Sequence, residues 1–166
     1  MVLGMSLATY TFAHVLISLI GIGSGLVVLY GLLVAKPLNG ISAIFLITTV
    51  LTSVTGFGFP FTHLLPSHIV GIISLVVLTI AIAARYRFHL SGAWRSIYVI
   101  SAALALYLNV FVLLVQSFEK VPAMKALAPT QKEPPFLVAQ LALLAVFVVL
   151  TILAAVRFHP ERVRMA

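Results

Sequence analysis

The sequence has 166 residues, of which 63% are hydrophobic and only 8% are charged, and its formal net charge is +7 at pH 7. A water-soluble domain of this length needs a far more polar surface than this composition provides. The sequence contains no cysteine, which excludes disulfides, thiolate metal sites and iron–sulfur ligation. The basic residues flank apolar runs and form no continuous patch, so they indicate membrane topology and exclude nucleic acid as the expected partner.

Five apolar runs are each close to the ~20 residues that cross about 30 Å of hydrocarbon. We therefore predict an all-α, polytopic membrane helix bundle in which residues 1–166 form a single transmembrane domain. No Lys or Arg precedes the first run, which lacks the basic flank of a cleaved signal peptide, and we expect this run to be retained. The predicted spans are about 9–34, 40–59, 68–86, 95–118 and 136–156, and a Pro-rich loop, 119–135, joins the last two.

In the first predicted span, polar and small residues follow one helical stripe. His14, Ser18, Gly21 and Gly25 are spaced i, i+4, i+7 and i+11. Gly21 and Gly25 also form a small-xxx-small pair, which permits the close approach of a neighbouring helix. We therefore predict that His14 points at another helix. Gly31 lies off this stripe, so we expect it to tolerate alanine better than the two stripe glycines tolerate leucine.

The second and third predicted spans carry a threonine stripe and a histidine. Thr48, Thr52 and Thr55 follow the i, i+4, i+7 pattern. Threonine commonly bonds to carbonyls of its own helix, so this stripe is predicted mainly to pack. His68 follows the N-capping residue Ser67 in the first turn of the third helix. The positive end of the helix dipole disfavours an imidazolium there, and a neutral imidazole is the form that binds metals.

The fourth and fifth predicted spans contribute amides. Asn109 and Gln116 share one face of the fourth span, and Gln140 lies near the outer end of the fifth. The loop between them is long for a helix–helix connection, and its four prolines stiffen it. It is equally compatible with a lid over the outer polar residues and with a solvated connector.

The distribution of basic residues predicts the orientation. By the positive-inside rule the N-terminus lies outside and the C-terminus in the cytoplasm, in a plasma membrane or a bacterial inner membrane. Tyr86, Trp94 and Tyr98 accompany the arginines of the segment 85–95, which predicts an interfacial belt of anchoring side chains. The side with more basic residues has Lys36, Arg85, Arg87, Arg95, Arg157, Arg162 and Arg164, and the opposite side has Lys120, Lys125 and Lys132.

Under this topology the polar side chains gather in the outer half of the membrane. Polar side chains are costly in lipid, so their location indicates function. We therefore predict an outer-leaflet site in which His14 and His68 are the ligands. We expect Asn109, Gln116 and Gln140 to support this site or to orient a bound molecule.

His14 and His68 lie on different helices at nearly the same predicted depth, which suits two neutral imidazoles on one iron. In this respect the chain resembles the small all-helical membrane cytochromes b of the ascorbate and ferric reductase type. The resemblance implies a b-type haem held by these two histidines. The second histidine pair of those proteins is missing, since His89 and His159 lie outside the predicted spans. A divalent zinc, copper or iron ion bound by His14, His63 and His68 is the alternative.

Three functional hypotheses remain open. The first is a small membrane protein that binds haem or a metal for redox or quinone chemistry. The second is a non-catalytic accessory subunit of a larger membrane complex, and the third is an oligomeric channel or solute carrier with the threonine stripe along its path. We expect a homo- or hetero-oligomer in the bilayer. The sequence has no Asp and no Glu within a predicted span, which disfavours proton-coupled transport, and it has no phosphate loop, nucleophile elbow or HExxH motif.

The predicted topology can be tested with reporter fusions. Reporters at the C-terminus and in the segment 87–93 should read cytoplasmic, because these ends of the spans carry more basic residues. A reporter inserted near Ala128 should read external. If the C-terminal reporter and the Ala128 reporter gave the same side, the five-span count would be wrong.

Overall fold

The computed structural model describes residues 4–60 and 66–159. Within these ranges five helices are long and apolar enough to cross a membrane, and the all-α prediction is confirmed. A short π-helical segment, η1, continues α3, and a short helix, α5, lies in the predicted Pro-rich loop. The elements are α1 (Leu7–Leu33), α2 (Asn39–Gly56), α3 (Pro66–Ile82), η1 (Ala83–Arg87), α4 (Ala93–Lys120), α5 (Pro122–Leu127) and α6 (Pro134–Arg157).

Local chemistry sets where the helices begin. The Ser6 hydroxyl accepts a hydrogen bond from the Thr9 amide at 3.1 Å, which caps α1. Gly92 precedes α4 with a φ of 52°, a left-handed conformation that glycine adopts without strain. Pro134 occupies the first position of α6, where its missing N–H has no intrahelical partner to lose.

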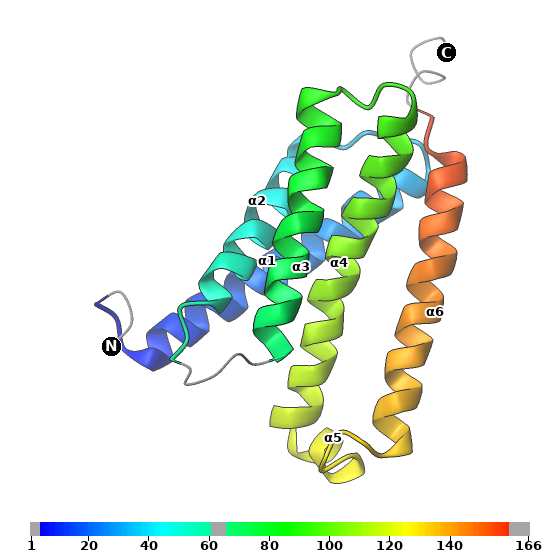
Figure 1. The fold of residues 1–166 in the computed structure, drawn as a ribbon. Helices are drawn as coiled ribbons and strands as arrows, with labels where there is room; N and C mark the ends of the chain where they lie inside the picture. The colour runs from blue at the N-terminus through cyan, green and yellow to red at the C-terminus, as the bar shows by residue number, and fades with distance from the viewer. Residues whose placement is uncertain (1–3, 61–65, 160–166) are drawn as a thin grey trace.

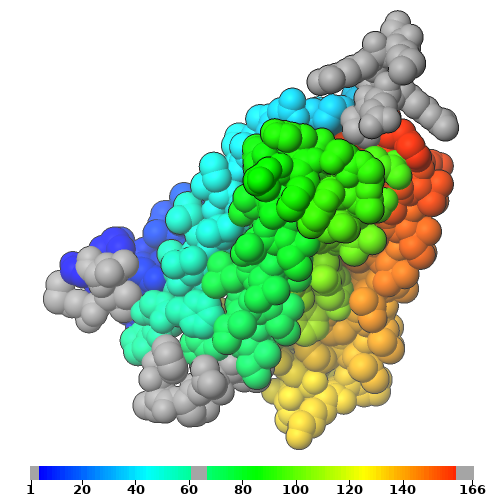
Figure 2. Space-filling view, turned by 45° about the horizontal axis from the view of Figure 1, so that its top comes forward, coloured from blue at the N-terminus to red at the C-terminus, as the bar shows by residue number. Residues whose placement is uncertain are grey.

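The long helices α1 to α4 pack as a ring in chain order, and α6 lies outside it. α1 packs on α2, α2 on α3, α3 on α4, and α4 on α1, whereas α6 lies against α4 and α1 (Figure 1). Figure 2 shows α3 and α4 at the front of the molecule, with α2 on one side and α6 on the other. Phe147 and Ala154 are the buried residues of α6, so most of the surface of this apolar helix is not covered by the rest of the bundle.

The stripe glycines of α1 lie at a close helix interface, as predicted. A Cβ added to Gly25 would lie 2.6 Å from Leu106 Cδ1 and 2.8 Å from the Phe45 ring. A Cβ added to Gly21 would lie 3.3 Å from the hydroxyl oxygens of both Thr48 and Thr49. Glycine at position 25 therefore lets α1 approach α2 and α4 more closely than a side chain would allow.

The expectation that Gly31 tolerates alanine is wrong. After α1 ends, the Lys36 amide donates to the Gly31 carbonyl at 2.8 Å, so the chain turns back over this residue. An added Cβ at Gly31 would lie 2.9 Å from the Lys36 carbonyl oxygen and 2.8 Å from Leu38 Cδ1. The obstacle is partly backbone, which cannot rotate away. The sequence stripe missed it because the contact comes from the following turn and not from another helix.

Two side chains of the predicted interfacial belt are buried, whereas others lie at the surface of the bundle. Tyr86 is half exposed, and Trp94 stacks on Phe88 with ring centroids 3.8 Å apart. Arg85 and Tyr98, by contrast, are buried, with 7% and 0% of their surfaces exposed. These two residues face the protein interior at the inner end of the bundle, so they are not lipid anchors.

The predicted Pro-rich loop is more structured than expected. α5 occupies its first half, and its second half folds back on α4, where Gln131 Nε2 donates to the Val115 carbonyl at 3.1 Å. Ala128 is fully buried, and the Thr130 hydroxyl donates to Glu133 at 2.8 Å. This bond lowers the pKa of the Glu133 carboxyl from its usual value. The loop thus forms an ordered connector across the outer ends of α4 and α6 (Figure 1).

Alanine substitution at three α1 glycines tests this packing. Gly25→Ala and Gly31→Ala should each destabilise the protein by ~1–3 kcal/mol, because both overfill a close contact. Gly23→Ala is the matched control, since no other atom lies within 4 Å of its added Cβ. Thermal unfolding in detergent measures the difference. Equal melting temperatures for all three variants would contradict the close packing at Gly25 and Gly31.

Candidate functional site

His14 makes a short hydrogen bond across the α1–α2 interface. His14 Nδ1 lies 2.7 Å from the Thr55 hydroxyl oxygen, and the histidine side chain is partly buried. Thr55 lies in the last turn of α2, near the outer end of the bundle under the predicted orientation. The sequence placed both residues in the outer half of the membrane, and the structure brings them into contact.

The hydrogen bonds of Thr55 indicate which ring nitrogen of neutral His14 carries the proton. The Thr55 hydroxyl also lies 2.7 Å from the Leu51 carbonyl oxygen, which can only accept. Thr55 has one hydroxyl proton, and when this proton goes to the Leu51 carbonyl, Nδ1 of His14 donates its own N–H to Thr55. We infer from this network that neutral His14 is protonated on Nδ1 and carries a lone pair on Nε2. No hydrogen bond to Nε2 is present within the described ranges.

Aromatic side chains surround this histidine. The Phe59 ring meets His14 edge to face at 5.2 Å and meets Tyr10 in the same way at 5.1 Å. Tyr10 is buried, and its hydroxyl donates to the Thr55 carbonyl at 2.7 Å. That carbonyl belongs to the last turn of α2, where intrahelical donors run out. Tyr10 and His14 therefore both fasten α1 to the same turn of α2.

His68 reaches the outer end of α2 from the opposite side. It is 4% exposed, and its ring lies 5.5 Å from the ring of Phe57. α3 carries His68, and α3 packs on α2 and α4, whereas α1 carries His14. The structure thus places both histidines at the end of α2, against different side chains. His63, the third histidine of the predicted metal set, lies outside the described residues.

No group of three or more metal-binding side chains is found in the part of the chain that the structure describes. The hypothetical site of His14, His63 and His68 includes one residue beyond those limits. The described His and Glu side chains therefore do not come together as the three or four ligands that zinc prefers.

The threonine stripe bonds mainly to its own helix. Thr48 donates to the Ile44 carbonyl at 2.7 Å, and Thr52 donates to the Thr48 carbonyl at 2.9 Å. These bonds favour the predicted packing role of the threonine stripe and not a role in lining a polar path. Asn109, predicted to support the site, lies deeper, with its Nδ2 3.4 Å from the hydroxyl oxygen of Thr49.

Sequence reasoning missed a second polar face on α2. Ser42, Thr49 and Ser53 are all buried, and the Ser53 hydroxyl donates to the Ser74 hydroxyl of α3 at 3.0 Å. The spacing i, i+7 and i+11 from Ser42 puts these three residues on one helical face. This spacing of small polar residues is the sequence signal that could have identified the face.

Gln140 is the most unusual of the predicted amides. Its side-chain oxygen and nitrogen are both buried, and neither has a hydrogen-bond partner among the described residues. Contacts of Phe118 with Phe136 at 5.3 Å and of Tyr107 with Phe147 at 5.6 Å set α4 and α6 antiparallel. Gln140 therefore lies level with the outer third of α4.

Gln116 and His14 lie at the same level of the bundle. Gly21 and Asn109 are close neighbours, and so are Gly25 and Leu106, so α1 and α4 run antiparallel. His14 on α1 and Gln116 on α4 each lie seven residues from the Gly21–Asn109 contact. At 1.5 Å per residue this is about 10 Å toward the same end of the bundle. α1 diverges from α4 toward this end (Figure 1). Under the predicted orientation the outer half thus holds His14, Gln116 and Gln140 at similar depth.

No protein-family model matches the chain, and comparisons with curated proteins and with solved structures find no match.

The inferred tautomer of His14 can be measured directly. Nitrogen NMR of histidine-labelled protein should show His14 protonated on Nδ1 and unprotonated on Nε2. Thr55→Val should remove this preference, because valine offers no acceptor to the Nδ1 proton. His159, at the other end of the molecule, serves as an internal control in the same spectrum. A His14 signal protonated on Nε2 in the unaltered protein would contradict the assignment.

Proposed function

We propose that this integral membrane protein binds a lipid-soluble ligand of the quinol class in its outer half, with His14 Nε2 as the hydrogen-bond acceptor. The observation that supports this most is the occupied Nδ1 of His14, 2.7 Å from Thr55, which directs a lone pair to Nε2. A quinol hydroxyl is a donor that suits this lone pair.

The surroundings of His14 favour a flat aromatic ligand over a hydrated solute. Phe59 and Tyr10 lie beside the histidine, and aromatic rings pair well edge to face or offset. The exposed residues of α1 near His14, such as Phe12 and Val15, are apolar and face lipid. A ligand would therefore arrive from the hydrocarbon, as a quinol does.

Gln140 supports a polar ligand at the same depth. A buried amide without partners costs free energy in a protein interior and more in lipid, where water cannot satisfy it. An amide both donates and accepts, so it can bond to either the carbonyl of a quinone or the hydroxyl of a quinol. In this proposal His14 accepts from one ring oxygen, and Gln116 and Gln140 are the amides at a similar level of the bundle.

A haem held by both histidines is the second candidate, and the packing favours it less. Two axial ligands must point at one iron from opposite faces of the macrocycle. His14 lies on Thr55 and Phe59, whereas His68 lies on Phe57, and α1 and α3 are not a closely packed helix pair. A ligand that needs one histidine agrees better with this arrangement.

Quinone analysis of the gently purified protein tests the proposal. Solvent extraction followed by chromatography should recover close to one quinone or quinol per chain. His14→Ala should lose most of it, because the acceptor nitrogen is gone, and Thr55→Val should retain less than the unaltered protein. His159→Ala is the matched control, since this histidine lies at the opposite end of the bundle.

The visible absorption spectrum of the same samples separates the candidates. The quinol proposal predicts no Soret band. A Soret band that disappears in both His14→Ala and His68→Ala would assign a haem to this site instead. Undiminished quinone in His14→Ala would exclude His14 as the acceptor, and a protein without quinone or chromophore would favour the accessory-subunit hypothesis.

A further inference from the structure

The inner end of the bundle contains a buried arginine. Arg85 lies in the π-helical segment η1, a rare conformation that is frequent at functional sites. Its guanidinium donates to the Asn39 side-chain oxygen at 2.6 Å and lies 5.0 Å from the centre of the Tyr98 ring. The side chain is 7% exposed, so it is almost completely removed from solvent.

No carboxylate neutralises this charge within the described ranges. The partner of Arg85 is a neutral amide, and its other close neighbours are the rings of Tyr86 and Tyr98. Of the three glutamates in the sequence, Glu119 and Glu133 lie at the other end of the bundle, and Glu161 lies outside the described residues. A buried charge is normally paired, because leaving water costs several kcal/mol.

The Tyr98 hydroxyl is a second unsatisfied group at this place. It lies beside Arg85 and Ser42, yet it is buried without a hydrogen bond of normal geometry in the described part of the chain. A guanidinium with spare N–H groups and an adjacent phenol together form a donor set for an anion.

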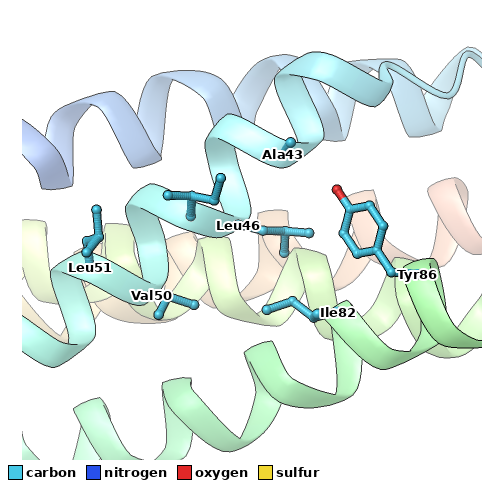
Figure 3. Close-up of a pocket in the computed structure, with 7 residues that line it drawn as sticks. Ala43, Leu46, Val50, Leu51, Ile82 and Tyr86 are labelled. Carbon is cyan, nitrogen blue, oxygen red and sulfur yellow. The ribbon is translucent and has the colours of Figure 1, made fainter.

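An apolar groove begins next to this cluster. It has a volume of about 360 Å³ and runs along α2 on the lipid-facing side (Figure 3). Tyr86 borders it at the inner end, and the Tyr86 ring centre lies 5.9 Å from Arg85 Cζ. From Ala43 to Leu51 the groove extends over about 12 Å of helix, at 1.5 Å per residue. Its lining residues are Ala43, Leu46, Ile47, Val50, Leu51, Ile82 and Tyr86.

We propose that this groove and the adjacent arginines bind one anionic phospholipid of the inner leaflet. The acyl chain lies in the groove between α2 and α3, and the phosphate lies at the inner end, where Arg87 is exposed and the buried Arg85 adds positive charge from within the bundle. Arg87 is exposed two residues beyond Arg85. Guanidinium groups bind phosphate with two parallel hydrogen bonds, and basic residues near the membrane surface attract anionic lipids.

Charge and location both select this occupant. Lys36, at the start of the neighbouring turn, adds a third positive charge at this end under the predicted orientation. The groove is open to lipid, since Ile47 is 60% exposed and Leu51 is 43% exposed. This site lies at the opposite end of α2 from His14 and does not depend on the quinol proposal.

Native mass spectrometry of the detergent-purified protein with added POPG or POPC tests the proposal. One POPG should bind at least about fivefold more tightly than POPC, because the arginines favour net negative charge. Arg87→Gln should weaken POPG binding about fivefold, the effect expected of one basic residue near the surface. Ala43→Phe should also weaken it, because the larger side chain fills the groove.

Matched controls keep the test independent of folding defects. Arg157→Gln removes an exposed charge at the inner end of α6, and Ile44→Phe enlarges the neighbouring lipid-facing residue outside the groove. Both should bind POPG as the unaltered protein does. Equal affinity for POPG and POPC, or POPG binding unchanged in both Arg87→Gln and Ala43→Phe, would overturn the site. Glu161→Gln should leave POPG binding and thermal stability unchanged, and a large loss of stability would identify Glu161 as the partner of Arg85.

Discussion

Every polar group in this bundle is constrained by the same fact, that lipid offers no hydrogen bonds. A side chain within a span must find its partner in the protein or remain unsatisfied at considerable cost. Thr55 is the clearest example, because its hydroxyl oxygen lies 2.7 Å from both the Leu51 carbonyl oxygen and His14 Nδ1. Its carbonyl also accepts from Tyr10. A single turn of α2 thereby holds the histidine on α1, and we infer from it the Nδ1–H tautomer.

Among the described residues, the groups without a full set of partners include four at the two ends of the bundle. At the predicted outer end they are His14 Nε2 and the Gln140 amide. At the predicted inner end they are the Tyr98 hydroxyl and the unneutralised guanidinium of Arg85. Between these ends, Thr48, Thr52 and Thr151 bond to carbonyls of their own helices. Unsatisfied groups concentrated at two depths fit two ligands, a neutral hydrogen-bonding molecule outside and an anionic lipid inside.

The five spans were predictable because a stretch of about 20 apolar residues in lipid leaves the backbone few alternatives to a helix. That His14 points at another helix also followed from helical spacing, whereas its partner on α2 came from the structure. The burial of Arg85 and Tyr98 did not, because a basic and aromatic cluster near a span end reads equally as an interfacial anchor. The close contact of Gly31 depends on how the chain turns after α1, and the partnerless amide of Gln140 depends on which side chains surround it. Spacing along one helix cannot reveal either.

The hydrogen bond between His14 and Thr55 supports the central claim, since it leaves Nε2 available to a ligand. A double-mutant cycle of His14→Phe and Thr55→Val, read out as unfolding free energy in detergent, measures this bond most directly. We expect a favourable coupling free energy of about 1 kcal/mol, the usual net value of a neutral hydrogen bond. Additive losses with no coupling would show that the two side chains do not act together, and the proposed acceptor would lose its basis.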